Sequence, residues 1–263
     1  MKELKKDKIK RKVQESYGKV ANSQLQSNCC NSGYCSIDEL ANRDTQLGYS
    51  KEEQNSVPEG ASMGLGCGNP QAIADIKEGE TVLDLGSGGG FDCFLAAQKV
   101  GDAGKVIGVD MTIEMLTKAR VNAEKGNYGN VEFRLGEIEN LPVADSTIDL
   151  IISNCVVNLS PDKQRVFKEA YRVLKNGGRL AISDIVLLKE LPDEVMNDLD
   201  MYSACISGSS LINDLQQYLE LAGFKNIRIN TKEESREFIS KWVTCFDLHN
   251  YITSATIEAE KIL

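Results

Sequence analysis

Histidine is almost absent from this sequence, since His249 is the single imidazole among 263 residues. Ser–His–Asp hydrolases, His-ligated zinc sites and di-iron sites each need more imidazole than this chain offers. We therefore expect chemistry that does not depend on histidine. We interpret His249 itself as a surface or packing residue.

Long apolar runs are also missing. The most apolar stretch, residues 180–191, is interrupted by Ser183, Asp184 and Lys189, whereas a membrane-spanning helix needs about 20 mostly apolar residues. The sequence therefore predicts no membrane span and no membrane partner. Because no apolar segment follows the basic N-terminus, it also predicts no secretory signal and a cytoplasmic location.

Basic residues are in deficit, with 30 Lys and Arg against 39 Asp and Glu and a net charge of −9. Residues 1–12 are an exception, because Lys and Arg predominate there, and the rest of the chain is correspondingly more acidic. An acidic body repels phosphate backbones, so we expect no nucleic-acid partner. We interpret the basic segment as the solvated face of an N-terminal helix.

Short apolar segments alternate with amphipathic ones between residues 81 and 186. Strands are predicted at residues 81–85, 105–109, 131–135, 148–153 and 179–186. Helices are predicted at residues 91–100 and 113–125, and again after Ser160, which precedes Pro161 as a helix N-cap would. This alternation is typical of an α/β fold with a doubly wound, mostly parallel sheet that helices cover on both faces.

The flanking segments differ in character and suggest three regions. Residues 1–69 are predicted to form a helix over 4–26 and then a cysteine-bearing lid, because residues 27–69 are polar with little periodicity. Residues 70–187 form the predicted α/β domain, which opens with a short helix at 70–76. Residues 188–263 are predicted as a smaller α+β substrate-binding region with a helix at 211–222, a strand at 225–230 and a closing helix at 247–262.

A glycine-rich turn, Gly86-Ser-Gly-Gly-Gly90, directly follows the first predicted strand and precedes a helix. Glycines there let backbone N–H groups approach a ligand at the positive end of the helix. Asp110 ends the next strand, where a carboxylate can accept the hydroxyls of a ribose. Asp84 disfavours the diphosphate of NAD, and Phe91 replaces the third glycine of the NAD pattern. S-adenosylmethionine (SAM), which has a cationic amino-acid tail and a ribose, matches both carboxylates.

Three motifs in order, at residues 82–90, 108–111 and 174–184, resemble those of class I SAM-dependent methyltransferases. The resemblance implies a Rossmann-like fold in which residues 70–187 bind SAM. The SAM contacts that it implies are Asp84, Gly86, Ser87, Gly88, Asp110, Met111, Glu137, Ile138 and Asn154. For Met111, which would pack on the adenine, a place in the core is the alternative.

Eight cysteines are present, and none forms a Cys-x-x-Cys pair. A zinc ribbon, a thioredoxin-type pair and a disulfide framework are therefore not expected. On the predicted fold, Cys67, Cys155 and Cys205 stand in segments that converge at the ligand edge of the sheet. Thiolates gathered from distant segments suit a soft ion such as trivalent arsenic. We interpret Cys93 and Cys245 as structural residues.

Residues 64–70 and 153–160 and the segment around Cys205 resemble the arsenite methyltransferases. The resemblance implies methyl transfer from SAM to arsenite and then to methylarsenite, a detoxification in which Cys67, Cys155 and Cys205 bind the arsenic and residues 188–263 form the arsenic-binding region. It also implies a thiol reductant, glutathione or thioredoxin, as co-substrate. An N-terminal cysteine would relay disulfide exchange to Cys67. We assign this relay to Cys30, with Cys29 and Cys35 as alternatives.

Two other functions fit part of the sequence. A SAM-dependent C- or O-methyltransferase acting on a quinone-like small molecule would account for the SAM motifs but not for the placement of the cysteines. A non-enzymatic, cysteine-rich metalloid-binding protein would account for the cysteines but not for the SAM motifs.

Overall fold

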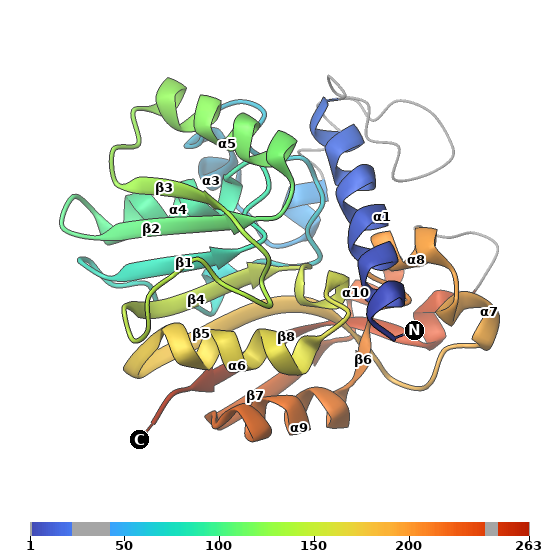
Figure 1. The fold of residues 1–263 in the computed structure, drawn as a ribbon. Helices are drawn as coiled ribbons and strands as arrows, with labels where there is room; N and C mark the ends of the chain where they lie inside the picture. The colour runs from blue at the N-terminus through green and yellow to red at the C-terminus, as the bar shows by residue number, and fades with distance from the viewer. Residues whose placement is uncertain (1, 23–42, 240–246, 263) are drawn as a thin grey trace.

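The computed structural model describes residues 2–22, 43–239 and 247–262. Its centre is one sheet with the strand order β3-β2-β1-β4-β5-β8-β7, in which the short β6 pairs with β5 (Figure 1). The strands are β1 (Thr81–Leu85), β2 (Lys105–Asp110), β3 (Val131–Leu135), β4 (Ile148–Asn154), β5 (Leu174–Leu187), β6 (Ser210–Leu211), β7 (Lys225–Lys232) and β8 (Ile252–Glu260). All pairings are parallel except those of β8 with β5 and β7. The prediction of a mostly parallel α/β sheet is confirmed.

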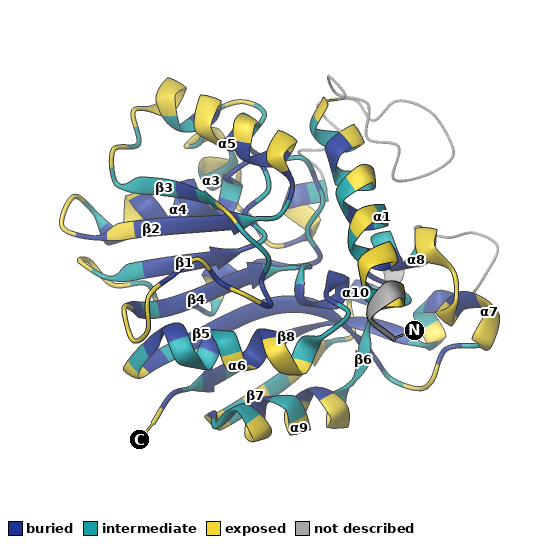
Figure 2. Cartoon of the chain, in the orientation of Figure 1, coloured by how far each residue is buried: buried dark blue, intermediate teal, exposed yellow. Residues whose placement is uncertain are grey.

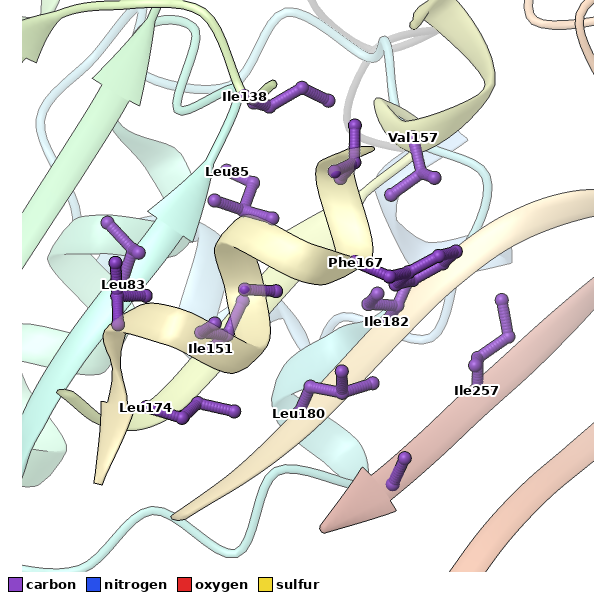
Figure 3. Close-up of a cluster of buried hydrophobic side chains, with 14 of the residues drawn as sticks. Leu83, Leu85, Ile138, Ile151, Val157, Phe167, Leu174, Leu180, Ile182 and Ile257 are labelled. Carbon is purple, nitrogen blue, oxygen red and sulfur yellow. The ribbon is translucent and has the colours of Figure 1, made fainter. Parts of the chain in front are cut away.

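Helices cover both faces of the sheet. One face packs against α4 (Phe91–Val100) and α5 (Ile113–Gly126), and the other against α6 (Lys163–Val173) and α9 (Ile212–Ala222). Figure 2 shows that the strands are largely buried, while exposed residues gather on the outward faces of the helices. In the core of the second face, Phe167 of α6 lies beside Ile182 of β5 (Figure 3).

Smaller elements connect this framework. They are α1 (Lys2–Asn22), α3 (Lys51–Asn55), η1 (Pro70–Ala72), η2 (Val157–Leu159), α7 (Asp193–Met196), α8 (Leu199–Ser203), α10 (Ser235–Ile239) and η3 (Leu248–Asn250). The helix predicted at residues 70–76 is thus only a single 3₁₀ turn. The N-cap predicted at Ser160 is also wrong, because Asp162 caps α6 by accepting a hydrogen bond from the Arg165 N–H. The Ser160 hydroxyl instead donates to the Glu139 carboxylate, 2.7 Å away.

The closing helix predicted at residues 247–262 is wrong, since most of this segment is strand β8. β8 lies between β5 and β7 and pairs antiparallel with both. β-branched residues such as Ile252, Thr253 and Ile257 favour a strand, and the two neighbouring strands satisfy the backbone groups on both of its edges. The C-terminal segment therefore extends the central sheet.

The basic helix α1 packs on the acidic body beside the carboxyl ends of the parallel strands (Figure 1). Its Ile9 and Val13 are buried in an apolar cluster. The same cluster contains Cys67, Cys155 and Cys205. Lys10 pairs with Glu137 at 2.7 Å, and its side chain is only 20% exposed. The predicted solvated face is therefore correct for only part of the helix, because opposite charges and apolar contacts hold the other part against the body. No helix in the described ranges combines the length and the apolarity needed to cross a bilayer.

Candidate active site

A cleft opens at the carboxyl ends of β1, β2 and β4. The space inside it, open mouth included, is about 1080 Å³. Its walls include these residues that the sequence predicted as SAM contacts: Asp84, Gly86, Ser87, Gly88, Asp110, Met111, Ile138 and Asn154. Helix α1 and the segment 44–66 also line it, so the described part of the predicted lid does border this cleft.

The glycine-rich turn forms one end of the cleft. Gly86 has φ +71°, and a Cβ there would lie 2.4 Å from a methyl group of Val156, so the turn has no room for a side chain. The Asp110 carboxylate accepts hydrogen bonds from the N–H groups of Gly88 (3.0 Å) and Thr112 (2.8 Å). The Ser87 hydroxyl is buried and has no hydrogen-bond partner among the residues that the structure describes. Because buried hydroxyls are normally satisfied, this group fits a polar ligand atom.

Two buried carboxylates, Asp84 and Asp92, line the same cleft. The Tyr49 hydroxyl donates to Asp92 at 2.8 Å, and the Cys93 thiol donates to Asp84 at 3.2 Å. Burial raises the pKa of both carboxyls, and at Asp84 the neighbouring charge of Asp92 raises it further. A cationic ligand would relieve this unfavourable burial of negative charge. Sequence reasoning missed Asp92, although its place in the first turn after the glycines was a signal.

Asn154 connects the cleft with the loop that carries Cys67. Its side-chain amide donates to the Gly68 carbonyl (2.8 Å) and to the Tyr49 hydroxyl (3.0 Å). Its oxygen accepts a hydrogen bond from the Cys67 N–H at 3.1 Å. The Ser254 hydroxyl of β8 donates to the Cys67 carbonyl at 2.7 Å. The Cys67 loop is therefore held by both the edge of the cleft and the C-terminal strand.

The structure brings Cys67, Cys155 and Cys205 together from three segments. All three are buried, with exposed fractions of 2%, 5% and 2%. The sulfurs of Cys67 and Cys155 and a carboxylate oxygen of Asp184 all lie within 4.8 Å of one another. The Cys205 thiol donates to the Cys155 carbonyl at 2.9 Å. Cys155 also lines the SAM-type cleft, so the thiols adjoin it.

Two of these cysteines have left-handed backbone conformations, with φ 59° at Cys155 and 60° at Cys205. This conformation costs a non-glycine residue roughly 1–2 kcal/mol. Hydrogen bonds hold it in place, from the Cys155 N–H to the Ser183 carbonyl (2.8 Å) and from the Cys205 N–H to the Tyr202 carbonyl (3.0 Å). Strain of this kind concentrates at functional sites.

Comparison with known proteins identifies the family. A family described as "Methyltransferase domain" matches residues 76–223. An arsenite methyltransferase of Halobacterium salinarum is 53% identical over 258 residues, covering 95% of this chain and 66% of that protein. The solved structure of an arsenic(III) S-adenosylmethionine methyltransferase from Chlamydomonas reinhardtii is 35% identical with a TM-score of 0.64, covering 84% of this chain and 74% of that one. The chain belongs to the arsenite methyltransferase family.

Further relatives include longer arsenite methyltransferases and a methyltransferase with a different substrate in its name. The chain spans 66% and 60% of the length of the Halobacterium and human arsenite methyltransferases, and it is 36% identical to the human protein over 85% of its own length. A ubiquinone/menaquinone biosynthesis C-methyltransferase of Haemophilus ducreyi is 30% identical over 70% of this chain and 71% of that protein. The predicted family and the class I methyltransferase fold are both confirmed.

The surroundings of the three site thiols raise the pKa of each of them. Burial raises the pKa of Cys67 to about 11. At Cys205 a hydrogen bond with Cys155 and burial both raise the pKa. At Cys155 the hydrogen bond with Cys205 lowers the pKa, but the contact with Cys67 and burial outweigh it. Burial therefore favours the protonated form of the thiols, whose protons a ligand would displace.

The remaining residues singled out from the sequence do not line the cleft or lie outside the described residues. Glu137 is beside the cleft, and its carboxylate pairs with Lys10. Cys93 is fully buried, as predicted for a core residue, although its thiol also contacts Asp84. The relay candidates Cys29, Cys30 and Cys35, together with Cys245, lie outside the described residues.

Proposed function

We propose that this protein transfers the methyl group of SAM to trivalent arsenic held by Cys67, Cys155 and Cys205. One observation carries the proposal: thiols from three separate segments lie together, buried, beside a cleft that is built on a glycine-rich turn and Asp110. The names of the Halobacterium and Chlamydomonas relatives support the same activity.

The cleft fits SAM in both charge and polarity. The buried carboxylates Asp84 and Asp92 favour a cationic ligand, and the unsatisfied Ser87 hydroxyl favours a polar one. Asp110 ends β2, the position from which a carboxylate accepts ribose hydroxyls in this class of fold. When bound, SAM supplies an electrophilic methyl group to the arsenic lone pair, which raises arsenic from the +3 to the +5 state.

Arsenite can exchange onto these thiols without a general base. Each arsenic hydroxyl leaves as water with the proton of the thiol that replaces it, so arsenite and three thiols give a neutral pyramidal AsS₃ group and three waters. High thiol pKa values, such as about 11 at Cys67, are compatible with this route because no free thiolate is required. A neutral complex also suits a site whose three sulfurs are buried.

Each methyl transfer oxidises arsenic from the +3 to the +5 state, so a two-electron reductant must return it to the +3 state before the next transfer. We propose a small thiol or thioredoxin as the reductant and Cys30 as the residue that relays disulfide exchange to Cys67. We also propose a cytoplasmic location and a role in arsenic detoxification. Cys30 can be tested separately, because Cys30→Ser would block turnover after the first transfer while leaving SAM binding intact.

The direct test supplies the protein with arsenite, a thiol reductant and methyl-labelled SAM. The proposal expects label in methylated arsenic. If no arsenic product forms although SAM binds, a small-molecule C- or O-methyltransferase is the better reading, with a quinone-like acceptor as the next substrate to assay. Thiol-dependent arsenic binding without any SAM binding would instead indicate a metalloid-binding protein.

Asp110→Ala should weaken SAM binding. Loss of hydrogen bonds to a charged group costs about 1.5–3 kcal/mol, so the dissociation constant should rise roughly 10- to 150-fold. Calorimetry measures this directly. Asp102→Ala is the matched control, since Asp102 is exposed in the loop that precedes β2. Unchanged SAM affinity in Asp110→Ala would show that β2 does not carry the ribose site.

A further inference from the structure

Arsenic binding makes no use of one buried carboxylate at the thiol site. A neutral AsS₃ group needs neither a fourth ligand nor a counter-charge. Yet a carboxylate oxygen of Asp184 lies within 4.8 Å of both the Cys67 and the Cys155 sulfurs. Asp184 is 2% exposed, so it is as deeply buried as the two cysteines.

Asp184 is held rigidly in this position. Its carboxylate accepts hydrogen bonds from the Ile185 N–H (2.8 Å), the Asn158 side-chain amide (2.8 Å) and the Asn158 N–H (3.2 Å). These three contacts fix the orientation of the carboxylate beside the two sulfurs. Outer contacts that fix the orientation of a carboxylate in this way are typical of metal ligands.

We propose that Cys67, Cys155 and Asp184 form a binding site for a divalent, thiophilic cation of the zinc class. The proposal deepens the proposed function, since such a cation would share two thiols with arsenic and exclude it. Thiolate and carboxylate together suit Zn²⁺, which takes sulfur at about 2.3 Å and oxygen at about 2.0–2.2 Å. Ligand atoms of a tetrahedral zinc ion stand roughly 3.5–3.8 Å apart at these bond lengths, so donors within 4.8 Å need only a small inward shift.

Zn²⁺ and arsenite place different charge requirements on the site. Two thiols bind a divalent cation by releasing two protons, and with the Asp184 carboxylate they give three negative charges around two positive ones. The neighbouring Lys163 attracts that carboxylate and can offset the remaining charge. Arsenite, by contrast, takes three thiols and needs no carboxylate. The cation should therefore depend on Asp184, and arsenic on Cys205.

The test compares the affinities of Zn²⁺ and arsenite in matched variants. All carry Ser at positions 29, 30, 35 and 245, which removes the other cysteines except Cys93, and a phosphine replaces thiol reductants. Zn²⁺ affinity is measured by competition with a chromophoric chelator, and arsenite affinity by calorimetry. Asp184→Asn should weaken Zn²⁺ at least tenfold more than it weakens arsenite. Asp200→Asn, which alters an exposed aspartate on α8, should change neither.

Cys205→Ser provides the reciprocal comparison and does not depend on how well Asp184→Asn folds. It should weaken arsenite at least tenfold more than Zn²⁺, while Cys67→Ser should weaken both. The metal site is refuted if Zn²⁺ affinity is insensitive to Asp184→Asn in a folded protein, or if Cys205→Ser abolishes Zn²⁺ and arsenite binding equally. A protein that fails to methylate arsenite but binds Zn²⁺ through Asp184 would overturn only the proposed function.

Discussion

Cys155→Ser and Cys205→Ser are each expected to abolish methylation of both arsenite and methylarsenite. Serine offers a hard oxygen ligand that cannot replace a thiolate at a soft centre. Both cysteines sit in left-handed conformations fixed by backbone hydrogen bonds, and the Cys205 thiol contacts the Cys155 carbonyl. We therefore regard them as the fixed pair of arsenic ligands, which every substrate must use.

Cys67→Ser should separate the two substrates. Arsenite has three exchangeable ligands, but methylarsenite has only two, because carbon occupies one position. Cys67 lies on the loop that enters the α/β domain before η1, and we take it as the third and most dispensable ligand. The variant should lose arsenite methylation and keep much of its methylarsenite activity. Each variant is assayed on both substrates, with SAM affinity as the control; equal loss of both activities in Cys67→Ser would refute this division.

Gly208→Ala should disrupt arsenic binding while sparing SAM. A Cβ at Gly208 would lie 2.1 Å from the Asn158 carbonyl oxygen and 3.0 Å from the Tyr202 ring. A backbone carbonyl cannot rotate away as a flexible side chain can, so the Cys205 loop must move relative to the segment after Cys155. Overpacking of this kind costs about 1–3 kcal/mol, which corresponds to a five- to 150-fold loss of arsenite affinity if the strain is relieved in the loop.

Calorimetry with arsenite and with SAM measures both effects of this substitution. Gly129→Ala is the matched control, because nothing lies within 4 Å of a Cβ at Gly129. Arsenite affinity that is the same in Gly208→Ala and Gly129→Ala would mean that the Cys205 loop does not need its observed position. A parallel loss of SAM affinity would place the damage in the shared fold instead.

The half of the fold that carries the cleft was predictable because its signals are local. Residues 81–85 form a short apolar run that ends at glycines, and β1 has the bounds predicted from that pattern. β3 likewise matches residues 131–135. The position of Asp110 at the end of β2 follows from the same alternation of strands and helices.

The failures arose where distant residues decide the outcome. In residues 247–262, Leu248, Ile252 and Ala255 recur at a helical spacing, but pairing with β5 and β7 makes most of this segment a strand. Asp184 lay within a motif that resembles the methyltransferases, yet its proximity to two sulfurs depends on the positions of loops 29 and 117 residues away in the sequence. The link from Tyr49 through Asn154 to Cys67 is equally non-local.

The hydrogen bond from Ser254 to the Cys67 carbonyl also has a consequence for protein synthesis, because 187 residues separate the two. At a translation rate of about 5–20 residues per second, roughly 10 to 40 seconds pass between the synthesis of Cys67 and that of Ser254. Until β8 has been made and has paired with β5, the sheet is incomplete and the Cys67 loop lacks this anchor. We therefore expect the site thiols to be more accessible to oxidants and thiophilic metal ions in the nascent chain than in the folded protein. Oxidation of these cysteines should accordingly occur mainly during synthesis.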